Sequence, residues 1–139
     1  MGPAVTVAPG ATIGATIGLM QKNRVGCVVV QEVKKAVGIF TERDVLSRVL
    51  AGGAALDDPI RTVMTPNPRT LRGEENLATV VRTMHAGGLR HLPVVDENGT
   101  AVGMVSIKRI IQHLVEHFPQ AVYNLPPDPA VVATARDGG

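Results

Sequence analysis

The sequence predicts an α+β fold made of two tandem copies of one small unit. Three observations support this prediction. The chain aligns with itself at a spacing of 64 residues, each copy shows the order strand, helix, strand, strand, helix, and apolar residues recur at the spacing of helix or strand faces. One copy alone would leave a small three-stranded sheet open on one face. We therefore expect the sheets and helices of the two copies to pack about a pseudo-two-fold axis.

The internal repeat rests on aligned pairs along most of the chain. A shift of 64 residues places Thr6 on Thr70, and beyond the first hairpin a shift of 65 residues places 37–41 on 102–106. The extra residue of the second copy lies near Asn98-Gly99. Hairpin turns accept insertions more readily than strands do, so the alignment is physically sensible.

The first copy begins with a short strand at Thr6-Val7. A helix is predicted over 11–22, strands over 26–30 and 36–40, and a second helix over 42–50. The period of the apolar residues decides each assignment, because helices repeat every 3.6 residues and strands every two.

The second copy repeats this order. A short strand at Thr70-Leu71 precedes a helix over 75–85, strands over 90–95 and 101–105, and a last helix over 108–117. Glycines end the first of these helices, and an Asn-Gly pair predicts a tight hairpin between the strands. Apolar residues define one face of each helix: Leu77, Val80, Val81 and Met84 in the first, and Ile110, Ile111, Leu114 and Val115 in the last.

These elements divide the chain into a repeat over 4–51, a linker over 52–59, a repeat over 60–118 and a tail over 119–139. We expect the tail to be disordered. The second repeat opens with a lead-in over 60–66, whose counterpart in the first copy would lie before residue 1. We therefore expect the chain to be a fragment or to lack its natural start.

Bulk composition narrows the classes of function. Hydrophobic residues make up 45% of the chain and aromatic residues only 2%, so the core is aliphatic and base-stacking platforms for nucleic acid are disfavoured. With 14 basic and 12 acidic residues, the charge is too balanced for a non-specific polyanion binder. Cys27 is the single cysteine, which excludes an intrachain disulfide, and we interpret it as a buried small hydrophobic residue. Without a secretory signal or an apolar run long enough to span a membrane, we expect a cytoplasmic protein.

Three segments of the chain resemble the CBS domain. They are Met84–Asp96, with its His91-Leu92-Pro93-Val94-Val95-Asp96 run, Val102–Ser106, and the Gly38–Asp44 run of the first copy. The tandem arrangement resembles a Bateman module, and the resemblance covers residues 4–118. It implies a regulatory module without catalytic activity that binds AMP, ADP, ATP or S-adenosylmethionine in a cleft between the repeats, and it implies no required cofactor.

The resemblance also implies which residues form the ligand site. In the family a Thr/Ser-x-x-Asp motif opens the second helix of a repeat, where the acid binds the ribose hydroxyls and the hydroxyl faces the phosphate. An ionised carboxylate can accept two hydrogen bonds from a diol, and a helix start favours phosphate. The implied contacts come from both repeats: Ile39, Thr41, Arg43 and Asp44 from the first, and Thr70, Leu89, Arg90, His91 and Pro93 from the second.

Each of these residues also has a plainer interpretation. Thr41 and Asp44 are spaced as a capping box, which needs no ligand, although both roles can hold together. His91 could be a strand residue at a partly exposed edge, and Arg90 could be a solvated surface side chain.

The second cleft departs from the family pattern. Arg109 follows Ser106 at the position where an acid is expected, and Val29 stands in the first copy where the second has Pro93. We therefore expect this cleft to be degenerate and empty.

His113-Leu114-Val115-Glu116-His117 matches a zinc-peptidase pattern, but it does not predict a metal site. Two His at i and i+4 share a helix face, yet only Asp128 and Asp137 follow as a third ligand, both in the tail. We interpret the segment as the polar face of the last helix. With no nucleophile, base and orienting group to assemble, the sequence does not predict an enzyme.

Two hypotheses remain. The first is a sensor of an adenosine compound that reports to an effector protein; the alternative is a ligand-free association module. The apolar helix faces, including Val45, Leu46, Val49 and Leu50, predict a homodimer in either case. No membrane and no nucleic-acid partner is expected.

Overall fold

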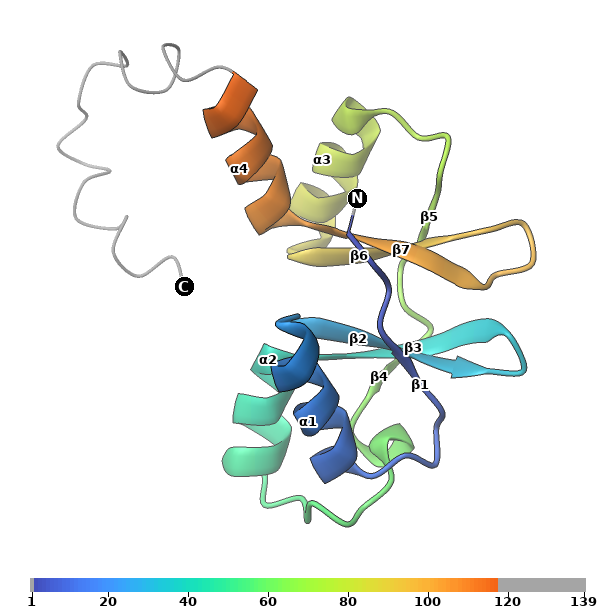
Figure 1. The fold of residues 1–139 in the computed structure, drawn as a ribbon, viewed down its shortest axis with the longest axis vertical. Coiled ribbons are helices and arrows are strands. Elements are labelled where there is room, and N and C mark those ends of the chain that lie inside the picture. Colours follow the sequence, from blue (N-terminus) through green and yellow to red (C-terminus); the bar gives the residue numbers. More distant parts are fainter. Residues whose placement is uncertain (1, 118–139) are drawn as a thin grey trace, which may run out of the picture. The chain divides into compact units, whose positions relative to one another are not determined.

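The computed structural model describes residues 2–117 of the chain. It divides into two compact units, Met1–Ile107 and Lys108–Gly139. The first unit contains both predicted sheets with helical segments around them (Figure 1). The predicted tail over 119–139 lies outside the described residues.

The first sheet has four strands in the order β1-β2-β3-β4. They are β1 (Thr6–Val7), β2 (Cys27–Glu32), β3 (Lys35–Thr41) and β4 (Thr65–Pro66). β1 lies parallel to β2, whereas β2 with β3 and β3 with β4 are antiparallel. The prediction of three strands is wrong for this sheet, because β4 comes from the lead-in that the sequence analysis assigned to the second repeat.

The second sheet has the predicted three strands, in the order β5-β6-β7. β5 (Leu71–Arg72) is parallel to β6 (His91–Val95), which forms an antiparallel hairpin with β7 (Ala101–Ser106). Gly2 forms an antiparallel bridge with Met104 of β7. In each repeat, a short segment ahead of the first strand therefore pairs with the hairpin of the other repeat: Gly2 with β7, and β4 with β3.

The first helix, α1 (Ile13–Asn23), confirms the prediction for this part of the chain. Thr12 caps its start by accepting a hydrogen bond from Ala15 N–H, at 3.1 Å. The predicted linker folds back on the same end, where the N–H groups of Ile13 and Gly14 donate to carbonyls of Asp58 and Leu56. These bonds satisfy donors that a helix start leaves without partners.

The helix predicted over 42–50 forms, but it is not a regular α-helix. Only α2 (Glu42–Asp44) is α-helical, and η1 (Val45–Leu50) is a π-helix. An i→i+5 hydrogen bond from Ala51 N–H to Leu46 O, 2.9 Å long, marks the wider turn. A further short segment, η2 (Ile60–Thr62), is a 3-10 helix within the predicted lead-in.

The second copy contains α3 (Leu77–Gly87), which begins after the capping residue Asn76 and ends at Gly88 in the left-handed conformation. α4 (Ile107–His117) has an amphipathic sequence, and nearly all of it belongs to the second compact unit. No helix within residues 2–117 is long and apolar enough to cross a membrane.

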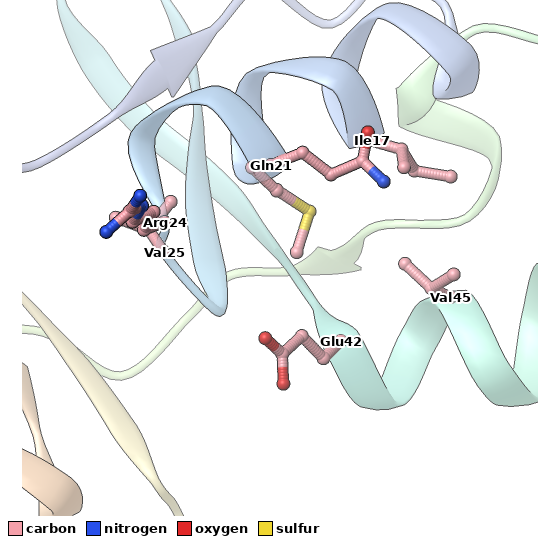
Figure 2. Close-up of a pocket in the computed structure, with 7 residues that line it drawn as sticks. Ile17, Gln21, Arg24, Val25, Glu42 and Val45 are labelled. Carbon is pink, nitrogen blue, oxygen red and sulfur yellow. The ribbon is translucent and has the colours of Figure 1, made fainter.

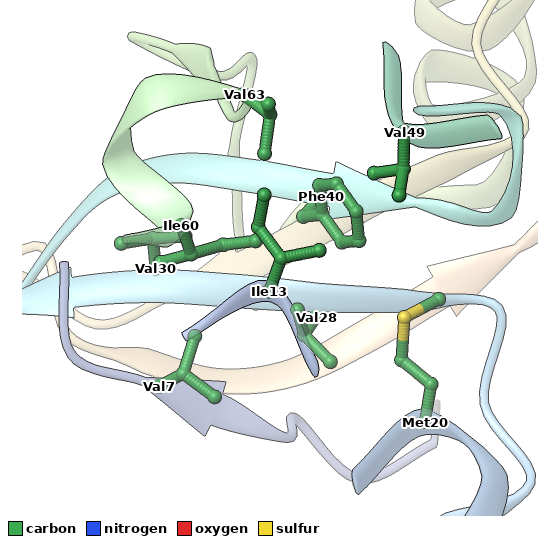
Figure 3. Packing of buried hydrophobic residues seen from close by; sticks show 9 residues of the cluster. All are labelled: Val7, Ile13, Met20, Val28, Val30, Phe40, Val49, Ile60 and Val63. Carbon is green, nitrogen blue, oxygen red and sulfur yellow. The ribbon is translucent and has the colours of Figure 1, made fainter. Parts of the chain in front are cut away.

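A hydrophobic core fills the space between the first sheet and its helical segments (Figure 3). Phe40, Ile13 and Ile60 are fully buried in it. Ile60 and Val63 belong to the lead-in, so the segment that contributes β4 also completes this core. The buried members are Val7, Ile13, Met20, Val28, Val30, Phe40, Val49, Ile60 and Val63.

The opposite face of the first sheet packs against the second sheet. Cys27, Val29 and Met104 form a small buried cluster there. The two hairpins are also joined by hydrogen bonds from Ala36 N–H to Gly99 O, at 2.9 Å, and from Ala101 N–H to the Gln31 side chain, at 3.0 Å. The two repeats thus bury their open sheet faces together, as predicted.

Candidate functional site

Thr41 and Asp44 form a complete capping box where β3 passes into α2. The backbone N–H of Thr41 donates to Oδ2 of Asp44 at 2.9 Å, and its hydroxyl donates to the same oxygen at 3.1 Å. In return, Asp44 N–H donates to Oγ1 of Thr41 at 3.3 Å. The structural role anticipated from the sequence is therefore present, and it holds the carboxylate of Asp44, a residue only 8% exposed, in a fixed orientation.

The two carboxylate oxygens of Asp44 have different surroundings. Oδ2 takes both hydrogen bonds from Thr41, whereas Oδ1 faces the guanidinium of Arg48, with 3.6 Å between Oδ1 and Nε. At that distance the contact is electrostatic rather than a hydrogen bond. Oδ1 therefore keeps acceptor capacity that its contact with Arg48 does not use.

Side chains of the two repeats meet above the backbone of Gly26. A Cβ added to Gly26 would lie 3.2 Å from Oε1 of Glu42 and 3.5 Å from Nε2 of His91. Glycine therefore leaves room for an acid from α2 and an imidazole from β6 to approach each other. Glu42 was not predicted as a site residue, because its closeness to His91 depends on the packing of the two sheets.

Burial lowers the pKa of the His91 imidazole below its usual value of 6.5. The charge of Glu42 acts in the opposite direction, and the charge of Arg90 adds to the lowering. His91 therefore favours its neutral form near pH 7, in which one ring nitrogen can donate and the other can accept a hydrogen bond.

The other residues expected from the second repeat have different degrees of exposure. Thr70 is exposed just before β5, and Arg90 is exposed at the start of β6, with its carbonyl accepting a hydrogen bond from Ile107 N–H at 2.9 Å. Leu89 is half-buried, with its side chain against Gly87. Pro93 is fully buried, opposite Met104 in the hairpin.

Two further expected residues lie in the first repeat. Ile39 is half-buried against the Cys27 cluster between the sheets, and Arg43 is exposed in α2. Thr41, Asp44 and Ile39 thus lie along one strand and the turn that follows it, while Arg43 points into solvent.

Ser106 and Arg109, the residues predicted for the second cleft, belong to different units of the structure, Met1–Ile107 and Lys108–Gly139. Ser106 ends β7 directly opposite His91 in the β6–β7 ladder. Arg109 is exposed on α4.

Burial, aided by the charge of Asp44, raises the pKa of the Cys27 thiol to about 12, which leaves it unreactive as a nucleophile.

A separate hollow of about 460 Å³ lies between α1 and α2 within the first repeat (Figure 2). Its floor is apolar, with Arg24 and Glu42 as its charged members, and Figure 2 shows Arg24 and Val25 at the end away from Ile17 and Val45. None of the predicted site residues lines it. The lining residues are Ile17, Met20, Gln21, Arg24, Val25, Glu42 and Val45.

Within residues 2–117, no three His, Cys, Asp or Glu side chains come together in a group that could hold a metal ion. His113 is exposed on α4.

The family to which the chain belongs follows from a comparison with protein families. The model of the CBS domain matches residues 1–51 and again residues 60–116. The chain belongs to the CBS domain family. The two matches coincide with the internal repeat, so the chain carries a CBS pair.

Curated relatives of this CBS pair include longer proteins. A CBS domain-containing protein of Arabidopsis thaliana, CBSCBSPB3, is 33% identical over 123 residues, which cover 86% of this chain and 22% of the relative. An uncharacterized protein of Methanopyrus kandleri is 33% identical over 110 residues, which cover 78% of this chain and 56% of the relative. The chain thus spans less than two thirds of the length of these relatives.

Solved structures of CBS pairs share the fold. A CBS domain protein from Pyrobaculum aerophilum, complexed with AMP, is 29% identical with a TM-score of 0.72, covering 84% of this chain and 94% of that one. The CBS domain pair of protein MJ0100, in complex with 5′-methylthioadenosine and S-adenosyl-L-methionine, is 25% identical with a TM-score of 0.74, covering 82% and 93%. Both of these similar structures thus hold adenosine compounds.

Proposed function

We propose that this CBS pair is a regulatory, non-catalytic module that binds an adenosine compound between its repeats, at Asp44, and reports its occupancy to an effector protein. The observation that carries the proposal is the geometry of Asp44. Its carboxylate is buried and fixed by Thr41 through one oxygen, while the other oxygen accepts no bond from Thr41. The adenosine compounds in the similar structures support the ligand class.

The chemistry of the neighbouring residues suits the parts of such a ligand. A ribose hydroxyl can donate to Oδ1 of Asp44 without disturbing the two bonds that Oδ2 accepts from Thr41. A phosphate can accept hydrogen bonds from His91 and pair with the exposed Arg90. The half-buried Leu89 and the exposed Thr70 offer apolar and hydroxyl contacts for a base.

Titration calorimetry with AMP and ATP tests the Asp44 site. Asp44→Ala removes a charge-assisted hydrogen bond of roughly 1.5–3 kcal/mol, and the affinity should fall by about ten- to a hundredfold. The fold should persist, because a lost cap costs only about 1 kcal/mol. Arg109→Ala, which removes the residue that replaces the acid in the second repeat, is the matched control and should have a much smaller effect.

Three outcomes would count against the proposal. Undiminished binding by Asp44→Ala would show that the ligand lies elsewhere, and two equal sites in the wild-type chain would contradict the asymmetry between Asp44 and Arg109. If AMP, ADP, ATP and S-adenosylmethionine all fail to bind, the ligand-free association module becomes the better explanation.

We also propose that the chain forms a homodimer through its exposed apolar helix faces. Leu46 and Leu50 of η1 are 64% and 72% exposed, and Leu77 and Val81 of α3 are also exposed. Val49, which the sequence analysis placed on the association face, is instead buried in the core of the first repeat. The wider turn of the π-helix leaves the two leucines as the apolar surface there.

A further inference from the structure

The Arg48 side chain contacts both the Asp44 carboxylate of the proposed ligand site and the backbone of Val63 and Met64. Its Nη1 donates to the carbonyl of Val63 at 2.7 Å and to that of Met64 at 3.0 Å. Its Nε lies 3.6 Å from Oδ1 of Asp44, four residues earlier in the chain. One guanidinium therefore joins the carboxylate of the proposed site to the backbone just ahead of β4.

The segment that Arg48 holds is tightly packed. Val63 is buried in the core of the first repeat. Met64 lies against β3 so closely that a Cβ on Gly38 would be 2.4 Å from its sulfur and 3.1 Å from the carbonyl oxygen of Thr65. Small shifts in this segment must therefore alter its contact with β3, because close-packed interiors do not deform smoothly.

The same segment leads directly to the other half of the proposed site. β4 pairs with β3 through Gly38 with Pro66 and Ile39 with Thr65, and the chain then continues to Thr70, just before β5. Arg48 thus lies between Asp44 of the first repeat and the segment that places Thr70 of the second.

We propose that Arg48 is a positioning residue that couples the Asp44 carboxylate to segment 63–66, so that occupancy of the cleft at Asp44 is transmitted to the pairing of β4 with β3. This inference rests on the proposed function. Thr41 already holds Oδ2 of the carboxylate, and a ribose hydroxyl on Oδ1 would also restrict the oxygen that faces the Arg48 guanidinium. The guanidinium in turn holds the carbonyls of Val63 and Met64. Coupling between two sites is reciprocal, so a change at segment 63–66 also changes the affinity at Asp44.

Arginine suits this position for a geometric reason. A planar guanidinium can donate from Nη1 to two carbonyls while Nε faces a carboxylate, whereas a lysine ammonium is a compact point charge. The carbonyl of Arg48 accepts a hydrogen bond from Ala54 N–H at 3.4 Å. Glycine at position 52 keeps this carbonyl clear, since a Cβ there would lie 2.5 Å from the Arg48 carbonyl oxygen.

Amide hydrogen exchange, measured by NMR on the full chain, tests the coupling without ligand. The probes are the N–H groups of Met64 and Asn67, which donate to the carbonyls of Ile60 and Val37. Arg48→Ala removes the hydrogen bonds to the carbonyls of Val63 and Met64 and should speed exchange at both probes by at least about two- to tenfold, the effect of losing one modest hydrogen bond. Arg82→Ala, an exposed arginine of α3, should leave both rates unchanged.

Asp44→Asn separates coupling from capping. Asparagine keeps an oxygen that can accept from Thr41 N–H, but it removes the charge that attracts Arg48. Exchange at Met64 and Asn67 should therefore rise in Asp44→Asn as well, and by less than in Arg48→Ala. Unchanged exchange in either variant would overturn the coupling.

The same probes with and without AMP test the transmission. AMP should slow exchange at Met64 and Asn67 in the wild-type chain. Arg48→Ala should still bind AMP, with an affinity reduced by no more than about fivefold because a partly exposed ion pair contributes little, but without slowing these amides. Equal slowing in the variant would overturn the transmission. Failure of the wild-type chain to bind AMP would overturn the proposed function and the transmission, while the ligand-free measurements alone decide the coupling of Asp44 to segment 63–66.

Discussion

At the scale of single residues, Asp44 combines a structural role with a proposed binding role because its two carboxylate oxygens have different partners. Oδ2 closes the capping box with Thr41, and Oδ1 is left toward Arg48. The sequence pattern predicted both Thr41 and Asp44, since the capping box and the family motif share one spacing. It did not predict Arg48, although an acid and an arginine at i and i+4 were visible in the sequence, because the carbonyls that Arg48 binds are 15 and 16 residues away.

His91 gives the chain a pH-dependent stability. Its pKa is lowered in the folded state by burial, so near pH 6.5 the unfolded chain binds more protons than the folded one. This contribution is fully present above pH 6.5 and is lost as the pH falls through that value toward the lower folded pKa. Urea unfolding of the wild-type chain should therefore show a lower free energy of unfolding at pH 5.5 than at pH 7.5.

Replacing the imidazole by a side chain that does not titrate isolates this effect. His91→Gln should reduce the difference between the two pH values, while His85→Gln, at an exposed position on α3, should retain it. A wild-type difference that persists in full in His91→Gln would mean that other groups cause it.

At the scale of elements, the two copies end their first helices at equivalent positions with different residues. Arg24 ends α1 with φ 53° and ψ 45°, and Gly88, 64 residues later, ends α3 with φ 61° and ψ 33°. Both lie in the left-handed region, which costs roughly 1–2 kcal/mol for a residue with a Cβ and little for glycine. The first copy therefore carries strain at a point where the second does not.

Exchanging these residues should change stability in opposite directions. Arg24→Gly should raise the free energy of unfolding by up to about 1 kcal/mol, and Gly88→Arg should lower it by about 1–2 kcal/mol. No atom lies within 4 Å of a Cβ added to Gly88, so backbone conformation rather than a clash would cause the loss. Urea titration measures both changes, and shifts of the same sign would contradict this account.

The elements also show which parts of the fold could be predicted. The helices and the two hairpins were predicted because their apolar residues repeat at a clear period over many positions. β4 could not be predicted, because Thr65-Pro66, unlike the short strands at 6–7 and 70–71, has no aligned counterpart in the other copy and forms only through its pairing with β3. The π-helix could not be predicted either, since Val45–Leu50 has the apolar pattern of an ordinary amphipathic α-helix.

At the scale of the whole molecule, the exposed leucines of η1 predict self-association. Light scattering at micromolar concentration should give the mass of a dimer for the wild-type chain, because an isologous contact can cover such surfaces. Leu50→Glu should give a folded monomer, whose thermal midpoint of unfolding no longer depends on protein concentration. Val33→Glu introduces the same charge at the exposed tip of the β2–β3 hairpin and should remain dimeric. A monomeric wild-type chain would contradict the proposed homodimer.

The exchange of short segments between the repeats has a consequence for synthesis on the ribosome. Ile60 and Val63 fill the core of the first repeat, and Thr65–Pro66 extend its sheet, yet all of them follow the first CBS match, which ends at residue 51. A nascent chain that has emerged only to residue 51 therefore lacks two buried side chains and one strand of its own first half. The first repeat cannot complete its native structure until translation has passed residue 66, so the two halves mature in overlapping steps rather than one after the other.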